Sequence, residues 1–158
     1  MIRIKRHTEG DSRVAVCPPT ISKFDKANAD HIQDVINLAD LFCDYLKRTA
    51  ARHDWTKAED PYRTMFYKDL CATIEGKMEF MDGEWAFLHY EVLEHHHLKR
   101  HCPENVNLFD VIEMICDCTA AGMARSGEIY DIDIPADILT KAVKNTVEIL
   151  KNNVEVVE

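Results

Sequence analysis

Apolar residues recur at intervals of three and four positions through most of this chain, and this period constrains the fold more than any other feature. Such a period places an apolar stripe on one side of each helix, where it faces a core. The clearest stripe lies between Ala29 and about Ala51 and consists of His31, Val35, Leu38, Phe42 and Leu46. Further helices are predicted over about 62–80, 84–100, 108–125 and 135–151.

Local signals set the ends of these helices. Pro61 suits a first helical turn, because its fixed φ is already helical and its missing N–H is not needed there. Asn107 is a good N-cap for a helix beginning at Leu108, and Ser126-Gly127 is a typical stop. With five glycines and five prolines, the chain has too few turn residues for an all-β fold.

The sequence therefore predicts an all-α fold, a single bundle of about five helices. Arg3 to His7 and Arg13 to Cys17 flank a turn-like stretch, which predicts a short irregular or hairpin segment at the N-terminus. The predicted division of the chain is an N-terminal segment over 1–26, a helical domain over 27–151 and a frayed tail over 152–158.

Composition excludes several classes of function. Lys and Arg number 19 against 28 Asp and Glu, and the net charge of −9 would repel the phosphates of a nucleic acid duplex. The longest run without a charged residue, Val14 to Ser22, is far too short to span a membrane. The first residues lack the apolar stretch of a signal peptide, so we expect a cytoplasmic protein whose six cysteines are free thiols.

Histidines are concentrated in one part of the chain. Of eight, seven fall between positions 31 and 101, namely His31, His53, His89, His95, His96, His97 and His101. His97 and His101 are four residues apart and would share a face of the predicted helix over 84–100, as metal ligands often do. His89 and His96 are seven apart and would also share a face. A solvated patch of histidines is the alternative interpretation.

Three further positions are candidate metal ligands. His31 lies on the apolar stripe of the first long helix, where a core histidine bonded to a carbonyl is the plainer interpretation. His53 and Asp54 are adjacent, and a kinked backbone after that helix would let both bind one ion; a helix end capped by the aspartate is the alternative. Asp117 is the one charge in an apolar helical stretch, so it needs a metal ion or a salt bridge to Arg125 or Lys57.

The order His31, then His53-Asp54, then Asp117 resembles the ligand pattern of the HD-domain superfamily of metal-dependent phosphohydrolases. The resemblance implies an HD-domain-like helical bundle in which His31, His53, Asp54 and Asp117 hold a divalent metal. It also implies that further histidines between the dipeptide and the last aspartate can serve a second ion, and His96, His97 and His101 are the candidates here. The implied cofactor is one or two ions of Mn, Fe, Zn, Co or Mg.

The sequence also resembles a narrower family of small bacterial and phage proteins placed near that superfamily, whose reaction is not assigned. The resemblance covers about residues 29–150. It departs from the family pattern at Cys102 and Cys118, where the family tends to have His and Trp. The matching strings are His31-Ile32-x-x-Val35, Arg52-His53-Asp54-x-Thr56-Lys57, Leu93-Glu94-His95-His96, His101-Cys102-Pro103-Glu104, Asn107-Leu108-x-Asp110 and Ile112-Glu113-Met114-Ile115-Cys116-Asp117.

These features lead to a hypothesis about the reaction. A metal-bound water would attack a small phosphorylated substrate such as a nucleotide. Glu59 would orient or deprotonate that water, and Lys57 would neutralise phosphate charge or pair with Asp117. Two alternatives stay open, a di-iron oxygenase of the HD type and a non-catalytic protein that binds metal or a protein partner. The apolar face of the last helix also leaves a homodimer open.

Overall fold

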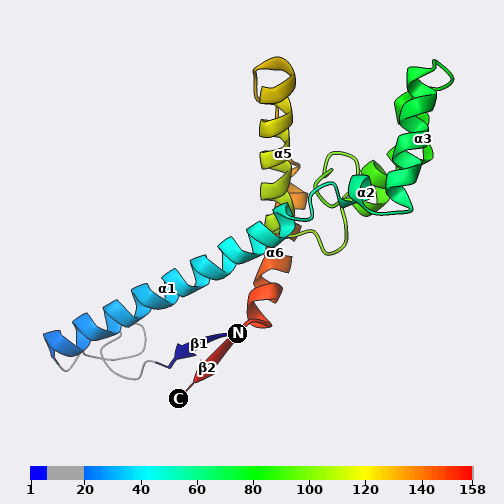
Figure 1. Ribbon diagram of the computed structural model, residues 1–158. Helices are drawn as coiled ribbons and strands as arrows, with labels where there is room; N and C mark the ends of the chain where they lie inside the picture. The colour runs from blue at the N-terminus through cyan, green and yellow to red at the C-terminus, as the bar shows by residue number, and fades with distance from the viewer. Residues whose placement is uncertain (7–19, 158) are drawn as a thin grey trace. The chain divides into compact units, whose positions relative to one another are not determined.

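Helices make up most of the protein, and the all-α prediction is confirmed (Figure 1). The structure, a computed structural model, describes residues 1–6 and 20–157. In chain order the elements are β1 (Ile2–Lys5), α1 (Ile21–Ala50), α2 (Trp55–Ala58), α3 (Tyr62–Ile74), the 3₁₀ turn η1 (Phe80–Asp82), α4 (Glu84–Leu88), the π-helical turn η2 (His89–Leu93), α5 (Leu108–Ser126), α6 (Ala136–Lys151) and β2 (Val154–Val157).

The chain divides into two compact units that do not follow the predicted segments 1–26, 27–151 and 152–158. The first unit combines Met1–Tyr45 with Val147–Glu158. In it β1 pairs in parallel with β2, so that Ile2 faces Val154 in the register. The predicted fraying of the tail is therefore wrong over β2, because these residues pair with a strand from the other end of the chain. The proposed partner strand of an N-terminal hairpin, Arg13 to Cys17, lies outside the described residues.

Helix α1 begins at Ile21, eight residues before the predicted start at Ala29. Thr20 acts as its N-cap, because the hydroxyl accepts a hydrogen bond from the Lys23 N–H at 3.2 Å. An ion pair between Lys26 and Asp30 at 2.7 Å, one helical turn apart, supports the same stretch. The predicted irregular segment thus extends too far, since capping and charge pairing make its last residues helical.

The second unit is Leu46–Thr146, and its core forms between α5 and α6. Helix α5 begins and ends as predicted. Asn107 accepts a hydrogen bond from the Phe109 N–H at 2.9 Å, Asp110 accepts one from the Asn107 N–H at 2.8 Å, and Gly127 follows the last turn with a φ of 77°. The apolar core of buried side chains consists of Leu98, Val106, Val111, Met114, Ile138 and Ala142.

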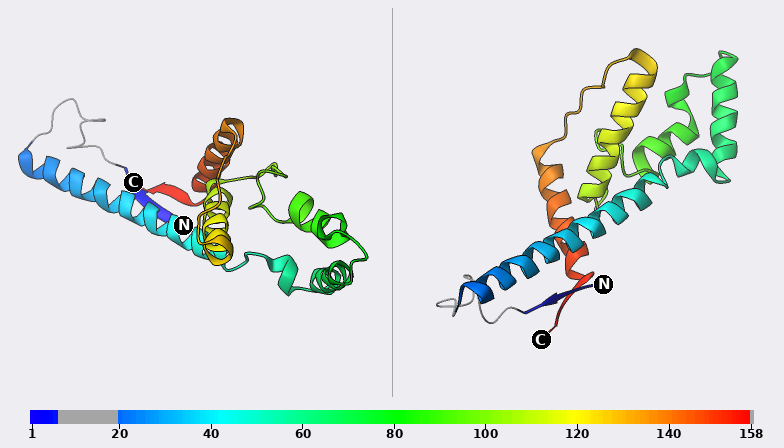
Figure 2. Two further views of the ribbon diagram at one scale, coloured as in Figure 1. Left: turned by 90° about the horizontal axis from the view of Figure 1, so that it is seen from above. Right: turned by 60° about the vertical axis from the view of Figure 1, so that its left-hand side comes forward.

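Helix α3 lies beside α4 in this unit (Figure 2). Aromatic side chains pack between them. Trp85 is fully buried, and its ring centroid lies 4.5 Å from that of Phe66 and 5.8 Å from that of Phe80. The predicted helix over 62–80 is too long, because α3 ends at Ile74 and Gly76 turns the chain with a φ of 70°.

The helix predicted over 84–100 is also too long, since regular structure ends at Leu93 and Glu94 is extended. Hydrogen bonds to Thr56 explain why the helix ends here. Glu94 is only 3 % exposed, and its carboxylate accepts hydrogen bonds from both the N–H and the hydroxyl of Thr56. A helix continued through Glu94 would space the following histidines about 100° apart around its axis. The extended Glu94 releases them from that spacing.

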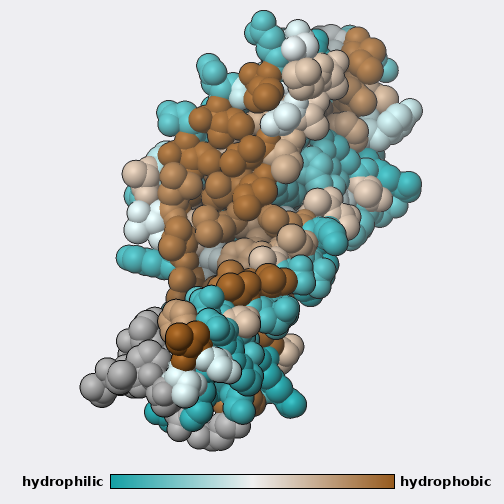
Figure 3. Space-filling view, turned by 90° about the vertical axis from the view of Figure 1, so that its left-hand side faces the viewer, coloured by the Kyte–Doolittle hydropathy of each residue, from teal (hydrophilic) through white to brown (hydrophobic). Residues whose placement is uncertain are grey.

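Apolar residues also remain at the surface, and Figure 3 shows them gathered on one face. Ile112, Ile115 and Met123 of α5 are exposed, so the apolar helix that carries Asp117 is not buried on all sides. Cys43, Cys71, Cys102, Cys116 and Cys118 are free thiols. Within the described part of the chain, no helix combines the length and apolarity that crossing a membrane requires.

Candidate metal centre

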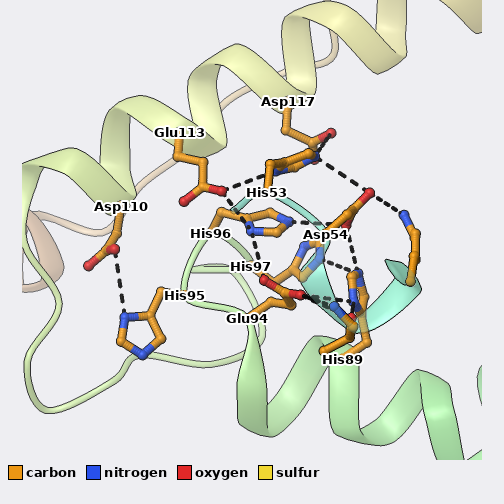
Figure 4. Close-up of polar contacts among 12 residues, drawn as sticks. His53, Asp54, His89, Glu94, His95, His96, His97, Asp110, Glu113 and Asp117 are labelled. Atoms are coloured by element: carbon orange, nitrogen blue, oxygen red, sulfur yellow. Dashed lines mark hydrogen bonds and ion pairs between the residues drawn. The ribbon is translucent and has the colours of Figure 1, made fainter. Parts of the chain in front are cut away.

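His53 and Asp54 occupy a tight turn between α1 and α2, at the kink that the sequence predicted. Asp54 has a φ of 55° and a ψ of 31°, the left-handed conformation that aspartate and asparagine tolerate better than most residues. The turn brings the two side chains together, with His53 Nε2 3.5 Å from Asp54 Oδ2 (Figure 4). Strained backbone of this kind is often found at functional sites.

Two overlapping groups of side chains surround Asp54, all within the second unit. One group contains Asp54, His89, His96 and His97, and the other contains His53, His96 and Asp117. In each group the candidate ligand atoms lie within 4.8 Å of one another, close enough to share one ion. The segments that supply them are far apart in the sequence, since α5 contributes Asp117 and the loop after η2 contributes His96 and His97 (Figure 4).

His96 belongs to both groups and is the most unusual residue of the site. It is 1 % exposed, and neither of its ring nitrogens has a hydrogen-bond partner. Its Nε2 lies 3.8 Å from Asp54 Oδ1, and its Nδ1 lies 3.5 Å from Glu113 Oε1. A buried polar atom left unpaired costs about 1–3 kcal/mol, so such atoms are rare in folded proteins. A cation bound between His96 Nε2 and Asp54 Oδ1 would give this nitrogen the partner that it lacks.

A buried hydrogen-bond chain fixes the orientation of His89. The Thr56 hydroxyl donates to Glu94 Oε1 at 2.9 Å, so its oxygen accepts from the Nδ1–H of His89 at 2.7 Å. The Nε2 of His89 therefore carries a lone pair, and it lies 2.8 Å from His97 Nε2 and 3.5 Å from Asp54 Oδ1. The ring of Trp85 stacks on His89 with a centroid distance of 4.3 Å. Metal-binding histidines are usually held in this way by a carboxylate or hydroxyl at the other nitrogen.

His53 has the same kind of support from Glu113. Its Nδ1 lies 3.1 Å from Glu113 Oε1, and its Nε2 faces the carboxylates of Asp54 and Asp117, each 3.5 Å away. His97 completes the arrangement, because its Nε2 lies 2.8 Å from His89 Nε2. The Nε2 atoms of four imidazoles thus converge on the two aspartates, while buried glutamates hold the outer nitrogens of His53 and, through Thr56, His89.

The electrostatics of the site divide the histidines into two kinds. Burial lowers the pKa of His89 to about 4 and that of His97 to about 3, and it also lowers the pKa of His96. These three rings are neutral, the form that binds a metal. The pKa of His53 is instead raised to about 10, chiefly by its hydrogen bonds to Asp117 and Glu113.

Negative charge exceeds positive charge in this group. Burial alone would raise the pKa of Asp54, yet its hydrogen bond from Lys57 and the nearby positive charges lower it overall. The hydrogen bond with His53 lowers the pKa of Asp117. Among the described residues, the carboxylates of Asp54, Glu113 and Asp117 face the Lys57 ammonium and the His53 imidazolium, while burial raises the pKa of the nearby Glu94 carboxyl. This excess suits a divalent cation.

The structure brings together most of the ligands that the sequence predicted. His53, Asp54, His96, His97 and Asp117 all belong to the two groups. His31 lies on α1 in the first unit and His101 follows the histidine tract, and neither is a member of these groups. His101 lies one hydrogen-bonded turn after His97, since its N–H donates to the His97 carbonyl at 3.1 Å, but its side chain does not join either group.

The two predicted catalytic residues have different positions. Lys57 pairs with Asp54, and not with Asp117. Glu59 is exposed after the last turn of α2, and the glutamates that contact the histidines are instead Glu94 and Glu113. Helical spacing offered a signal for Glu113, which is four residues before Asp117 on α5. The sequence pointed to His89 only through its spacing of seven residues from His96, and Glu94 gave no local signal, since the contacts of these residues with Thr56 join segments 33 and 38 residues apart.

His95 has a separate environment from its two neighbours in the tract. Its Nδ1 lies 3.6 Å from Asp110 Oδ1, and this contact is the main reason that the pKa of His95 is raised. Asp110 also caps α5. His95 thus connects the histidine tract to the start of α5, while His96 and His97 belong to the candidate metal centre.

Replacing Thr56 by valine is expected to weaken metal binding by about 10–100-fold, the usual effect of losing a partner behind a metal ligand. Valine has a similar shape, but it cannot accept the proton of His89 Nδ1 or donate to Glu94. The measurement is the dissociation constant for Zn²⁺ or Mn²⁺ by competition with a chelating dye. Thr56→Ser keeps the hydroxyl and should bind nearly as the wild type does. Equal affinity of the valine and wild-type proteins would contradict the orienting role of Thr56.

Comparison with known proteins gives one match. Residues 20–155 match a family model described as a family of unknown function, DUF5662. No curated protein and no solved structure matches the chain. The description of the family names neither a reaction nor the HD-domain superfamily, so the resemblance to that superfamily stays an expectation.

Proposed function

Because the chain belongs to DUF5662, a family of unknown function, its activity has to come from the site, and we propose that it is a metal-dependent phosphohydrolase acting on a small phosphoester. The observation that carries the proposal is His96, a buried imidazole with no hydrogen-bond partner on either nitrogen, located among three other imidazoles and two aspartates. Nitrogen and oxygen donors of this kind suit Zn, Mn, Fe or Co more than they suit Mg.

Asp54, His89, His96 and His97 hold the first ion in this proposal. Thr56 and Glu94 orient His89, and Lys57 holds the second oxygen of Asp54. His53 and Asp117, which share His96 with the first group, would hold a second ion once His53 releases its Nε2 proton, because only a neutral imidazole binds a metal. When bound, the metal lowers the pKa of a coordinated water and stabilises negative charge on the phosphoryl group.

A cavity that reaches the histidines supports turnover over a purely structural metal site. His96, His97 and Asp117 line a cavity of about 180 Å³. A substrate in this cavity meets members of both ligand groups. In the hydrolysis, a bond forms between the water oxygen and phosphorus, the bond from phosphorus to the alcohol oxygen breaks, and the departing alkoxide takes up the proton that the water loses.

Elemental analysis of untagged protein, followed by a test of phosphate release, examines this proposal. We expect one ion per chain if the Asp54 group alone is filled and two if both groups are filled. Release of phosphate from p-nitrophenyl phosphate should require added Mn²⁺, Co²⁺ or Zn²⁺ and stop with a chelator. Metal binding without turnover of any phosphoester would overturn the reaction but keep the metal centre. Bound iron with oxygen consumption would favour the oxygenase alternative.

A further inference from the structure

The cavity next to the candidate metal centre has lining residues that the proposed reaction does not explain. Besides His96, His97 and Asp117, the lining includes Tyr90, Lys99 and Arg100. Lys99 and Arg100 are adjacent in the sequence, close after the histidine tract. Two neighbouring basic side chains at a cavity are notable in a chain whose net charge is −9.

Neither positive charge is strongly neutralised. The Lys99 Nζ donates to the backbone carbonyl of Asp131 at 2.8 Å, and a carbonyl carries no net charge. Arg100 has its Cζ 5.6 Å from the ring centroid of Tyr90 and its Nη1 3.3 Å from Glu91 Oε1. That ion pair is exposed, and exposed pairs contribute little, about 0–1 kcal/mol. Both side chains can therefore turn to a ligand at low cost.

Lys99 and Arg100 make this cavity suitable for an anion. The aspartates of the metal centre repel a phosphate dianion, so an anionic substrate gains from cations in the same cavity. A guanidinium presents parallel N–H donors that match two phosphate oxygens, and an ammonium adds a compact positive charge. His96 also lines this cavity, is 1 % exposed and has no hydrogen-bond partner. This unpartnered imidazole indicates a ligand site at the same cavity, independently of the charges.

A second cavity in the same unit does not suit an anion. It has a volume of about 260 Å³, and its lining includes the carboxylates of Glu94, Asp110 and Glu113 beside the basic Arg52 and His95. His95 already pairs with Asp110. Negative groups therefore dominate this cavity, whereas in the first cavity the only carboxylate is that of Asp117.

We infer that Lys99 and Arg100 bind the phosphoryl oxygens of the substrate, and that the substrate is a terminal phosphomonoester. The inference rests on the proposed function. The size of the cavity adds to it, because about 180 Å³ is below the roughly 300–1,000 Å³ of pockets that enclose a whole small molecule. The phosphoryl group enters and the alcohol part of the substrate extends outward. A bridging phosphodiester would have to fit a second organic group into the same space.

Inorganic phosphate is the probe for this inference, with binding measured by calorimetry on the metal-loaded protein. Lys99→Gln and Arg100→Gln should each raise the phosphate dissociation constant about tenfold or more, and the double variant should raise it further. Glutamine in place of Lys99 can still donate to the Asp131 carbonyl, so the fold keeps that bond. Lys77→Gln, at an exposed position outside this cavity, is the matched control and should leave phosphate binding unchanged.

Metal content measured on the same samples separates this inference from the proposed function. Equal metal content in wild type and variants, with weaker phosphate binding in the variants alone, supports the inference. Wild-type phosphate affinity in the double variant, or no phosphate binding by the metal-loaded wild type, would overturn it. If the wild type takes up no metal, the proposed function fails, and the same titration on the metal-free proteins still decides whether Lys99 and Arg100 form an anion site.

Discussion

Replacing Asp54 by asparagine is expected to remove the metal from the protein and to end metal-dependent phosphate release. The Asp54 carboxylate is the only one in its group, and its Oδ1 lies 3.5 Å from His89 Nε2 and 3.8 Å from His96 Nε2. Loss of this charge should weaken binding by more than the roughly 10–100-fold that an outer partner contributes. Asparagine is the sharper variant than alanine because it tolerates the left-handed backbone of Asp54, whose φ is 55°.

Glu59→Gln is the matched control for this experiment. Glu59 is also acidic and follows Asp54 by five residues, but it is exposed and belongs to neither ligand group. Metal content and phosphate release should match the wild type. Metal bound at the wild-type level in Asp54→Asn would remove Asp54 from the ligands. A loss of activity in Glu59→Gln would restore the catalytic role that the sequence predicted for that residue.

Replacing Trp85 by alanine is expected to reduce the free energy of unfolding by about 3–5 kcal/mol, the usual effect of deleting a buried aromatic side chain. Trp85 is fully buried, packs against Phe66 and Phe80, and stacks on His89. Its indole N–H donates to the Thr56 carbonyl at 3.2 Å, and its backbone N–H donates to Asp69 at 2.8 Å. Only the second bond survives in the variant. Urea denaturation in the presence of a chelator measures the change without any contribution from metal.

Phe87 provides the control, because it lies on the same short helix α4 but is 58 % exposed. Phe87→Ala should change the free energy of unfolding by about 0.5 kcal/mol or less, as most surface substitutions do. Equal destabilisation by the two variants would mean that burial at Trp85 is not what stabilises this unit. With metal added, Trp85→Ala should also bind the ion more weakly, because the ring that supports His89 is gone.

The parts of the fold that could be predicted from the sequence depend on neighbouring residues. Asn107 and Gly127 set the ends of α5, because a cap and a left-handed glycine act within one helical turn. The kink at Asp54 belongs to the same class, because two adjacent residues at a helix end indicate it, whereas the grouping of His53 with Asp117 was expected from the resemblance to the HD-domain superfamily.

The ends of other elements depended on residues far along the chain. Helical period alone continued the helix through Glu94 to residue 100, whereas hydrogen bonds from Thr56, 38 residues earlier, hold Glu94 in an extended conformation. Strand β2 likewise forms only because β1, from the opposite end of the chain, pairs with it. Such contacts cannot be deduced from local propensity, because tertiary packing overrides it.

What the sequence determined by itself is the type of chemistry, an all-α protein with an excess of imidazole and carboxylate ligands. What only the tertiary structure decided is which of these ligands meet. His89 joins the centre because Thr56 and Trp85 hold its ring, and Glu113 supports His53 across 60 residues of sequence. His95, His96 and His97 are consecutive, yet each faces a different partner, because the extended Glu94 ends the helix before them. Residue type sets what a side chain can bind, whereas packing between distant segments sets where it points.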